Sequence, residues 1–275
     1  MRHARLLMML MAWLMSSPSA WAASSAADAH AAHVHTPEPA PDPVLAQDQS
    51  PLSDHADYAD NADHAHQPSF GALRFERLER AYSSDANATL YDLYGWYGGT
   101  YDRAVIKAEG EVAQGKLHEA RSELLWSHAL APFWDSQLGV RHDAGDGPNR
   151  AWLAFGIEGL APYWFDVEAT AYLGTSGRTA LRLAASYELL ITQRLILQPR
   201  AEANVYGRRD DGLMRGTGLS DVVAGLRLRY EFSRQFAPYL GVERSGKTGN
   251  SADLAHAAGE KPMETRWVAG VRFWF

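Results

Sequence analysis

Apolar and polar residues alternate with a period of two over long stretches of this chain, beginning near residue 70. Between residues 194 and 206, for example, Leu195 lies on one face of an extended segment, and Arg200 and Glu202 lie on the other. Such segments are longer than the five or six residues usual for strands of soluble proteins. They match the roughly 9–11 residues of a membrane-crossing strand, which turns one face to lipid and the other to a polar lumen.

Glycine-rich turn signals separate these segments, and about twelve strands result. Single-chain bacterial barrels close with an even number of strands, which twelve satisfies. Ten strands stay possible, because the first two segments are the least regular. The approximate predicted bounds are 71–81, 88–97, 102–113, 117–128, 132–143, 150–160, 163–173, 178–189, 193–206, 218–232, 235–245 and 265–275.

The final segment indicates the class of protein most clearly. Trp267, Val271, Phe273 and the terminal Phe275 share one apolar face of an alternating strand. An aromatic residue at the end of such a strand resembles the insertion signal of outer-membrane proteins. We therefore predict an all-β fold, an antiparallel transmembrane β-barrel over residues 70–275.

The first 22 residues are typical of a secretory signal peptide. Arg2 and Arg5 flank the start of an apolar run over residues 6–15, and Ala20 and Ala22 stand where a signal peptidase cleaves. The run is about half the roughly 20 residues that a membrane-spanning helix needs. We expect residues 1–22 to be removed and the mature barrel to reside in the cell outer membrane of a Gram-negative bacterium.

Residues 23–69 are rich in Ala, His, Asp and Pro, and we predict a disordered arm in the periplasm. Such a segment buries too little apolar surface to offset the entropy lost on ordering. Imidazole beside carboxylate is a reasonable ligand set for divalent metals, so we expect weak capture of several ions. The alternative is a solvated linker without a metal role. The candidate ligands in the arm are His30, His33, His35, His55, His64 and His66.

Within the barrel, His142 beside Asp143 is a further candidate metal ligand at the rim, since the predicted strand ends there at a glycine-rich turn. His118, His128 and His256 are expected on the rim or in loops. Aromatic residues near strand ends are expected to form interfacial girdles. These are Trp96, Trp126, Trp134, Trp152, Tyr163, Trp164 and Trp267.

Charged residues of both signs occupy the polar face of the predicted strands. At facing positions they are expected to form a paired network that fills a narrow lumen, with a selective ion path as the alternative. The inward set is Lys107, Glu109, Glu111, Arg121, Glu123, Arg141, Asp143, Glu168, Arg182, Glu188, Arg200, Glu202, Arg227, Arg229, Glu231 and Arg272.

Composition excludes several other chemistries. The chain has no cysteine, which rules out disulfides and thiolate ligands. Its formal charge of −7 argues against a nucleic-acid partner. There is no Gly-x-Ser-x-Gly motif, and Ser127 and His128 are adjacent, so they point to opposite faces of a strand. We therefore expect no enzymatic activity.

Several long stretches in a fixed order resemble the copper-resistance protein B family of outer-membrane proteins. They are 96–99, 107–111, 132–135, 139–143, 159–165, 189–200, 218–221, 225–231 and 236–239. The resemblance implies an outer-membrane barrel, a role in copper tolerance, copper binding at the periplasmic end, and a soluble multicopper oxidase in the periplasm as partner. Family members often carry a Met-rich arm, whereas the mature chain keeps only Met214 and Met263.

This departure bears on the metal, because thioether sulfur suits Cu(I) whereas imidazole suits Cu(II), zinc and nickel. We predict a copper-resistance protein that binds copper through its His- and Asp-rich arm and sequesters it or passes it on, with Cu(II) favoured and zinc or nickel as alternatives. Its expected partners are outer-membrane lipid, copper ions and the oxidase. The alternative is a general pore or a structural barrel with no specific metal role.

Overall fold

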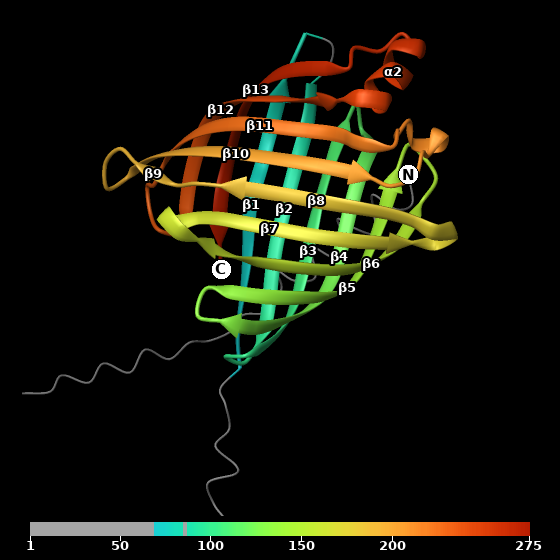
Figure 1. Cartoon of the computed structure of the whole chain (residues 1–275). Helices are drawn as coiled ribbons and strands as arrows, with labels where there is room; N and C mark the ends of the chain where they lie inside the picture. Colours follow the sequence, from blue (N-terminus) through green and yellow to red (C-terminus); the bar gives the residue numbers. More distant parts are fainter. Residues whose placement is uncertain (1–68, 85–86) are drawn as a thin grey trace, which may run out of the picture. The chain divides into compact units, whose positions relative to one another are not determined.

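The computed structural model describes residues 69–84 and 87–275, and these residues form a β-barrel (Figure 1). Thirteen strand segments make twelve strands, because β8 and β9 both pair with β10 as two parts of one interrupted strand. The strands are β1 (Phe70–Tyr82), β2 (Asn87–Gly98), β3 (Asp102–Ala113), β4 (Lys116–Ala131), β5 (Trp134–Gly145), β6 (Arg150–Ala161), β7 (Phe165–Gly174), β8 (Arg178–Ser186), β9 (Leu189–Leu190), β10 (Leu195–Tyr206), β11 (Gly218–Tyr230), β12 (Phe236–Lys247) and β13 (Met263–Trp274).

The barrel is closed and antiparallel throughout. Strands that follow one another in the chain pair with each other, and β1 pairs with β13 to complete the ring. The predicted fold class is therefore confirmed with twelve strands, and the alternative of ten is wrong. The predicted bounds agree with the observed strands to within three residues, apart from a break at 187–188 between β8 and β9.

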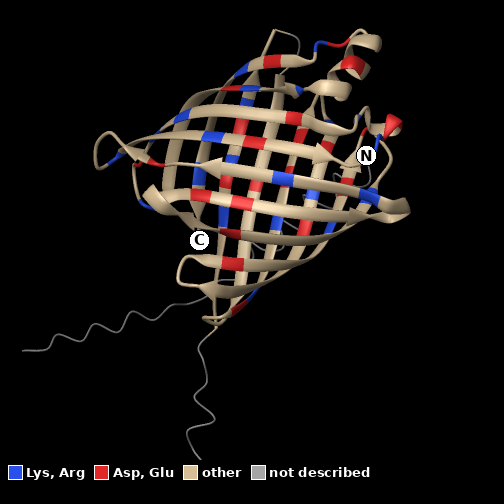
Figure 2. Cartoon of the chain, viewed as in Figure 1, with Lys and Arg blue, Asp and Glu red and all other residues tan. Residues whose placement is uncertain are grey.

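Apolar side chains cover the outside of the barrel. Leu124 is 60% exposed, Leu153 52% and Leu240 68%, and comparable side chains occur on most strands. The inward positions carry charge instead, and Arg141 and Arg229 are each only 2% exposed. Figure 2 shows charged residues of both signs along the strands. A continuous exposed apolar surface of this kind is rare on soluble monomers. It is the surface expected of a barrel whose outside contacts lipid.

The two ends of the barrel differ in their connections. At the end that carries the start of β1 and the C-terminus, here named the terminal end, short turns join β2 to β3, β4 to β5, β6 to β7 and β11 to β12. At the opposite end, the loop end, residues 207–217 and 248–262 form the two longest connections. The second of these contains α2 (Gly249–Ala257), visible above the barrel in Figure 1.

Helix α2 was not predicted, because the sequence there shows a glycine-rich turn at 246–249. Its alanine-rich sequence favours a helix, and Ser251 and Ala255 are the buried residues of this helix. Among the described residues, no helix is long and apolar enough to cross a membrane. Residues 69–84 and 87–275 also contain three short 3-10 turns, at Pro162–Trp164, Thr175–Gly177 and Asp211–Leu213.

Candidate functional site

Ion pairs between neighbouring strands line the interior of the barrel. Arg182 on β8 donates to both carboxylate oxygens of Glu202 on β10 at 2.9 Å. It also donates to Glu168 on β7 at 3.0 Å. Arg121 on β4 lies 2.6 Å from Glu109 on β3. The expectation of a paired charge network in the lumen is therefore confirmed, since bidentate Arg–carboxylate contacts of this kind fix both partners.

A second buried group contains Arg227, which was predicted to point inward, and three residues that were not predicted: Glu79, Tyr239 and Glu243. Arg227 on β11 donates to both oxygens of Glu79 on β1 at 3.0 and 2.8 Å and to Glu243 on β12 at 2.8 Å. The Tyr239 hydroxyl donates to Glu79 at 2.9 Å. The register of β1 shifts between Phe75 and Leu78, which breaks the period of two in this strand. This bulge explains why the inward position of Glu79 could not be found by alternation.

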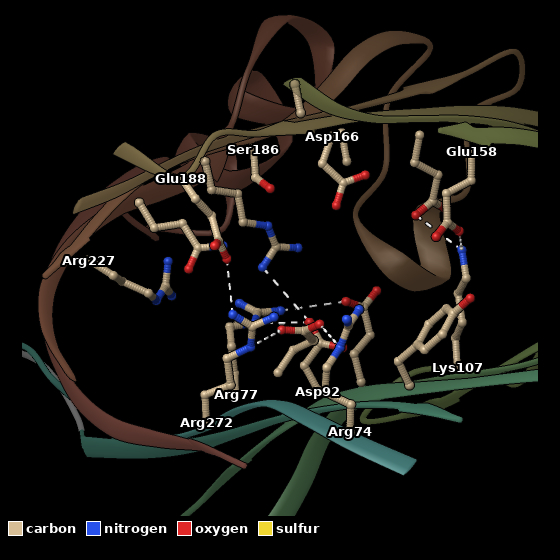
Figure 3. Close-up of a pocket in the computed structure, with 18 of the residues that line it drawn as sticks. Arg74, Arg77, Asp92, Lys107, Glu158, Asp166, Ser186, Glu188, Arg227 and Arg272 are labelled. Carbon is tan, nitrogen blue, oxygen red and sulfur yellow. Dashed lines mark hydrogen bonds and ion pairs between the residues drawn. The ribbon is translucent and has the colours of Figure 1, made fainter. Parts of the chain in front are cut away.

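Two adjoining cavities occupy the terminal half of the lumen, and we name them together the vestibule. The larger has a volume of about 570 Å³ and the smaller about 540 Å³. Charged side chains from most strands reach the larger cavity (Figure 3). Among them are Arg74, Arg77, Asp92, Lys107, Glu158, Asp166, Glu168, Glu188, Arg227, Arg229 and Arg272.

The vestibule offers no nitrogen or sulfur ligand to a metal from imidazole, thiolate or thioether. No His, Cys or Met lines either cavity. Within residues 69–84 and 87–275, no group of three or more His, Cys, Asp and Glu side chains has an arrangement suited to a metal ion. Most of the vestibule carboxylates are also engaged with cations; Lys107, for instance, lies 2.7 Å from Glu158 and 3.2 Å from Glu168.

The structure does not bring His142 and Asp143 together. His142 is exposed on the outer face of β5, whereas Asp143 is buried inside the barrel. The Asp143 carboxylate accepts from Arg141 at 2.6 and 2.9 Å and from the Trp152 indole at 3.0 Å. Adjacent strand residues face opposite sides, so a shared site at this pair is not formed here, and the metal role of each residue stays a prediction.

The other histidines of the barrel lie where they were expected. His118 pairs with Asp146 at the loop end, and His128 lies 2.9 Å from Asp102 at the terminal end. His256 is exposed on α2. The six candidate ligands of the arm, His30, His33, His35, His55, His64 and His66, lie outside the described residues, as do the signal peptide and nearly all of the arm.

The loop half of the lumen is filled mainly by three large aromatic side chains and by the buried pair of Arg141 and Asp143. Trp152, Tyr172 and Tyr206 form a buried cluster with Val105 and Leu125. The prediction that Trp152 belongs to an interfacial girdle is therefore wrong, because its indole is only 5% exposed. Trp96 packs against the same cluster, so the girdle prediction is wrong for this residue too. Trp126 and Trp267 are exposed on the surface as predicted, whereas Trp164 is exposed but lines the vestibule.

Room for the Trp152 indole comes from the neighbouring strand. Trp152 on β6 stands opposite Gly174 on β7 in the sheet register. A β-carbon at Gly174 would lie 2.7 Å from the indole ring, closer than real side chains approach. The glycine therefore lets the ring lie flat against the barrel wall.

Above this filled half, residues 207–217 and α2 form what we name the cap. Asp210 accepts from Arg150 at 2.8 and 2.9 Å, and it lies 3.2 Å from Arg178. Arg215 donates to Glu119 at 2.9 Å. The hydrogen bonds from Arg150 hold the pKa of Asp210 below its usual value, so this carboxylate stays ionised across the physiological range.

The Ser251 hydroxyl of α2 accepts from the Gly216 amide at 2.7 Å and so joins the helix to residues 207–217. The Ser220 hydroxyl donates to the Gly216 carbonyl at 3.0 Å and ties the same turn to β11. The loop end is therefore covered by a connected unit, while the terminal end carries the vestibule.

Comparison with known proteins gives matches over the whole barrel. The family described as copper resistance protein B precursor matches residues 69–275. A copper resistance protein B homolog of Pseudomonas syringae pv. tomato (strain ATCC BAA-871 / DC3000) is 46% identical over 200 residues, which are 73% of this chain and 68% of that relative. Copper resistance protein B of Escherichia coli is 43% identical with the same coverage of both chains.

Solved structures with a similar outline include two porins. The NanC porin has a TM-score of 0.48 and 12% identity, covering 74% of this chain and 99% of that chain. The KdgM porin has a TM-score of 0.45 and 14% identity with the same coverage.

Proposed function

Because the chain belongs to the copper resistance protein B family, we propose that it is an outer-membrane copper-resistance protein that binds copper through its His- and Asp-rich segment, residues 23–69. The observation that carries the copper-resistance role is the family match across residues 69–275. The clustering of histidines between His30 and His66 supports binding by the segment. The two relatives named copper resistance protein B, at 46% and 43% identity, support the copper-resistance role. The family resemblance predicted from the sequence is confirmed by these matches.

The outer membrane is supported by the barrel itself. Its outside carries apolar side chains on most strands, and its backbone pairs around a closed ring. Both properties are needed in lipid, where an unpaired backbone group is costly. Barrels of this class keep short turns on the periplasmic side. With that orientation the terminal end and the segment before β1 face the periplasm.

The distribution of candidate ligands along the chain supports copper binding by residues 23–69 rather than by the barrel. The vestibule lacks His, Cys and Met, and His118, His128, His142 and His256 are dispersed over the barrel surface. Six of the ten histidines after residue 22 lie between His30 and His66. Imidazole and carboxylate together favour Cu(II), with zinc and nickel as competitors. The segment would capture several ions weakly and pass copper to a soluble periplasmic multicopper oxidase, in a role that involves no catalysis by this chain.

Calorimetric titration of the detergent-folded full-length protein tests the proposal. One variant replaces His30, His33, His35, His55, His64 and His66 by Ala, and the matched control replaces His118, His128, His142 and His256. Cu(II), Cu(I) and Zn(II) are titrated into each. We expect the first variant to lose Cu(II) binding and the control to keep it.

Growth in elevated copper completes the test in cells. Cells producing the six-histidine variant should lose tolerance, while cells producing the control should keep it. Copper binding that survives in the six-histidine variant would place the site on the barrel, and His142 would be the next residue to replace. If the wild-type protein binds no copper, a pore or structural barrel becomes the better description.

A further inference from the structure

The vestibule carries opposite charge on opposite walls. In a ring of twelve strands, β6 and β7 lie six positions away from β13 and β1. Three carboxylates line the cavity from β6 and β7, those of Glu158, Asp166 and Glu168. Across the lumen, β13 and β1 contribute the guanidinium groups of Arg272, Arg74 and Arg77. They also contribute one carboxylate, that of Glu76, so the net charge of this wall is positive. Figure 3 shows Glu158 and Asp166 on one side of the space and Arg272 and Arg77 on the other.

Asp166 stands apart from the ion-pair network. Glu158 and Glu168 share Lys107, but no hydrogen bond or ion pair engages the Asp166 carboxylate within the described part of the chain. The residue is exposed to the lumen, and its carboxylate points into the cavity in Figure 3. A carboxylate in this position is available to a cationic group that enters the vestibule.

The basic side also has unused hydrogen-bonding capacity. Arg227 and Arg229 on β11 are 4% and 2% exposed, and both line the cavity. The Arg227 Nη1 and Arg229 Nε groups are buried without a hydrogen-bond acceptor among the described residues. Buried N–H groups of a guanidinium are costly to leave unpaired, and a carboxylate is the partner whose geometry suits them.

We propose that the vestibule binds a small zwitterionic solute, an amino acid or short peptide, with its carboxylate toward the arginines and its ammonium group toward Asp166. A simple anion is attracted by the arginines and repelled by the carboxylates of the opposite wall. A simple cation is attracted by the carboxylates and repelled by the arginines. A zwitterion makes a favourable electrostatic interaction with both walls. Such interactions are stronger in a narrow lumen than in bulk water. The volume of about 570 Å³ is within the usual range of small-molecule sites.

Four related peptides test this inference directly. Triglycine is the zwitterion, N-acetyltriglycine carries only the anion, triglycine amide carries only the cation, and N-acetyltriglycine amide is neutral. Each is titrated calorimetrically into the full-length, metal-stripped protein in detergent, so that copper bound elsewhere cannot recruit the peptide. Triglycine should bind about tenfold more tightly than either singly charged peptide, the factor expected from one additional ion pair.

Two variants test which wall binds which charged group of the peptide. Asp166→Asn should remove the advantage of triglycine over N-acetyltriglycine and keep its advantage over triglycine amide. Arg74→Gln should remove the advantage of triglycine over triglycine amide and keep its advantage over N-acetyltriglycine. Glu76, the partner of Arg74, keeps its ion pair with Arg272 at 2.9 Å in this variant, so we expect the fold to be preserved. Asp211→Asn, in an exposed turn of the cap, is the matched control and should change neither ratio.

Equal affinities for all four peptides, no binding of any, or tighter binding of N-acetyltriglycine than of triglycine would each overturn the proposal. An Asp166→Asn variant that discriminates as the wild type does would overturn it as well. These outcomes are independent of the copper titrations, because neither the six-histidine variant nor its control changes a residue that lines the vestibule.

Discussion

The two halves of the lumen are built from the same strands by the same alternation, yet one half is filled and the other is hollow. In the loop half, Trp152, Tyr172 and Tyr206 pack together, and Arg215 of the cap lies over the Tyr206 ring. In the terminal half, charged side chains line a vestibule of several hundred Å³. Alternation thus decides which side chains point inward, and their size and partners decide whether any space remains.

The largest effect is expected from opening the filled half. Wild-type protein in a planar bilayer should show little conductance, because two barriers, the cap and the aromatic cluster, lie in series. Shortening residues 208–216 should leave conductance low, and adding Trp152→Ala should produce resolvable channel openings. Trp267→Ala, on the outer surface at 70% exposure, is the control and should change nothing. A large steady conductance of the wild type would contradict the contrast between the halves.

Next in size is the loss of stability when a buried ion pair is broken in the filled half. Asp143→Ala leaves Arg141, which is 2% exposed, without its carboxylate. We expect the free energy of unfolding to fall by about 3–5 kcal/mol, the usual cost of an uncompensated buried charge.

The matched variant in the hollow half is Glu158→Ala. Lys107 keeps Glu168 at 3.2 Å there and water can enter, so we expect a loss of about 1 kcal/mol or less. Urea unfolding of both variants in the same detergent measures the difference. Equal losses would show that the vestibule is as dry as the filled half.

A smaller effect is expected in the cap, and it depends on pH. Asp210→Asn weakens the contacts with Arg150 and Arg178, and we expect a loss of about 1–2 kcal/mol at neutral pH. The pKa of Asp210 is lowered in the folded state. Its contribution is therefore complete above the ordinary Asp range and disappears as pH falls through the lowered pKa.

The unfolding temperatures of wild type and the Asp210→Asn variant, compared at pH 7 and again in strong acid, test this sign. The difference between the two proteins should be largest at pH 7 and should shrink in acid. A difference that grows in acid would rule out the ionised carboxylate as the source of the stability.

The smallest effect is expected at the exposed pair of Arg209 and Asp211, whose side chains are 59% and 74% exposed. Asp211→Asn should change the free energy of unfolding by about 0–1 kcal/mol, because solvent screens such pairs. The change measured for this variant is the reference against which the losses of the other variants are compared in the same unfolding assay. A loss comparable to that of Asp143→Ala would mean that the cap is coupled to the filled half.

Strand positions were accessible from the sequence because period-two alternation and turn residues are local signals. The partners that a side chain finds on other strands were not accessible from the sequence, because they depend on the assembled barrel. The bulge after Phe75 hid Glu79, and Trp152 is inside because Gly174, on another strand, leaves space for its ring. A network of ion pairs in the lumen was predicted from the sequence. The position of Asp166 across the lumen from the arginines was not, because it depends on which strands lie opposite each other in the ring. The helix at 249–257 was hidden by the glycine signals at its start.

The seam between the first and last strands has a consequence for how the molecule is made. Phe275, the final residue, exchanges backbone hydrogen bonds with Leu73 near the start of β1, at 2.9 and 3.3 Å. The ring therefore cannot be completed until β13 is present, and contacts of such sequence separation form slowly. Until then β1 and β12 present open edges that invite mispairing. A chain lacking β13 should therefore aggregate rather than form a smaller barrel, because β13 is the strand that closes the ring.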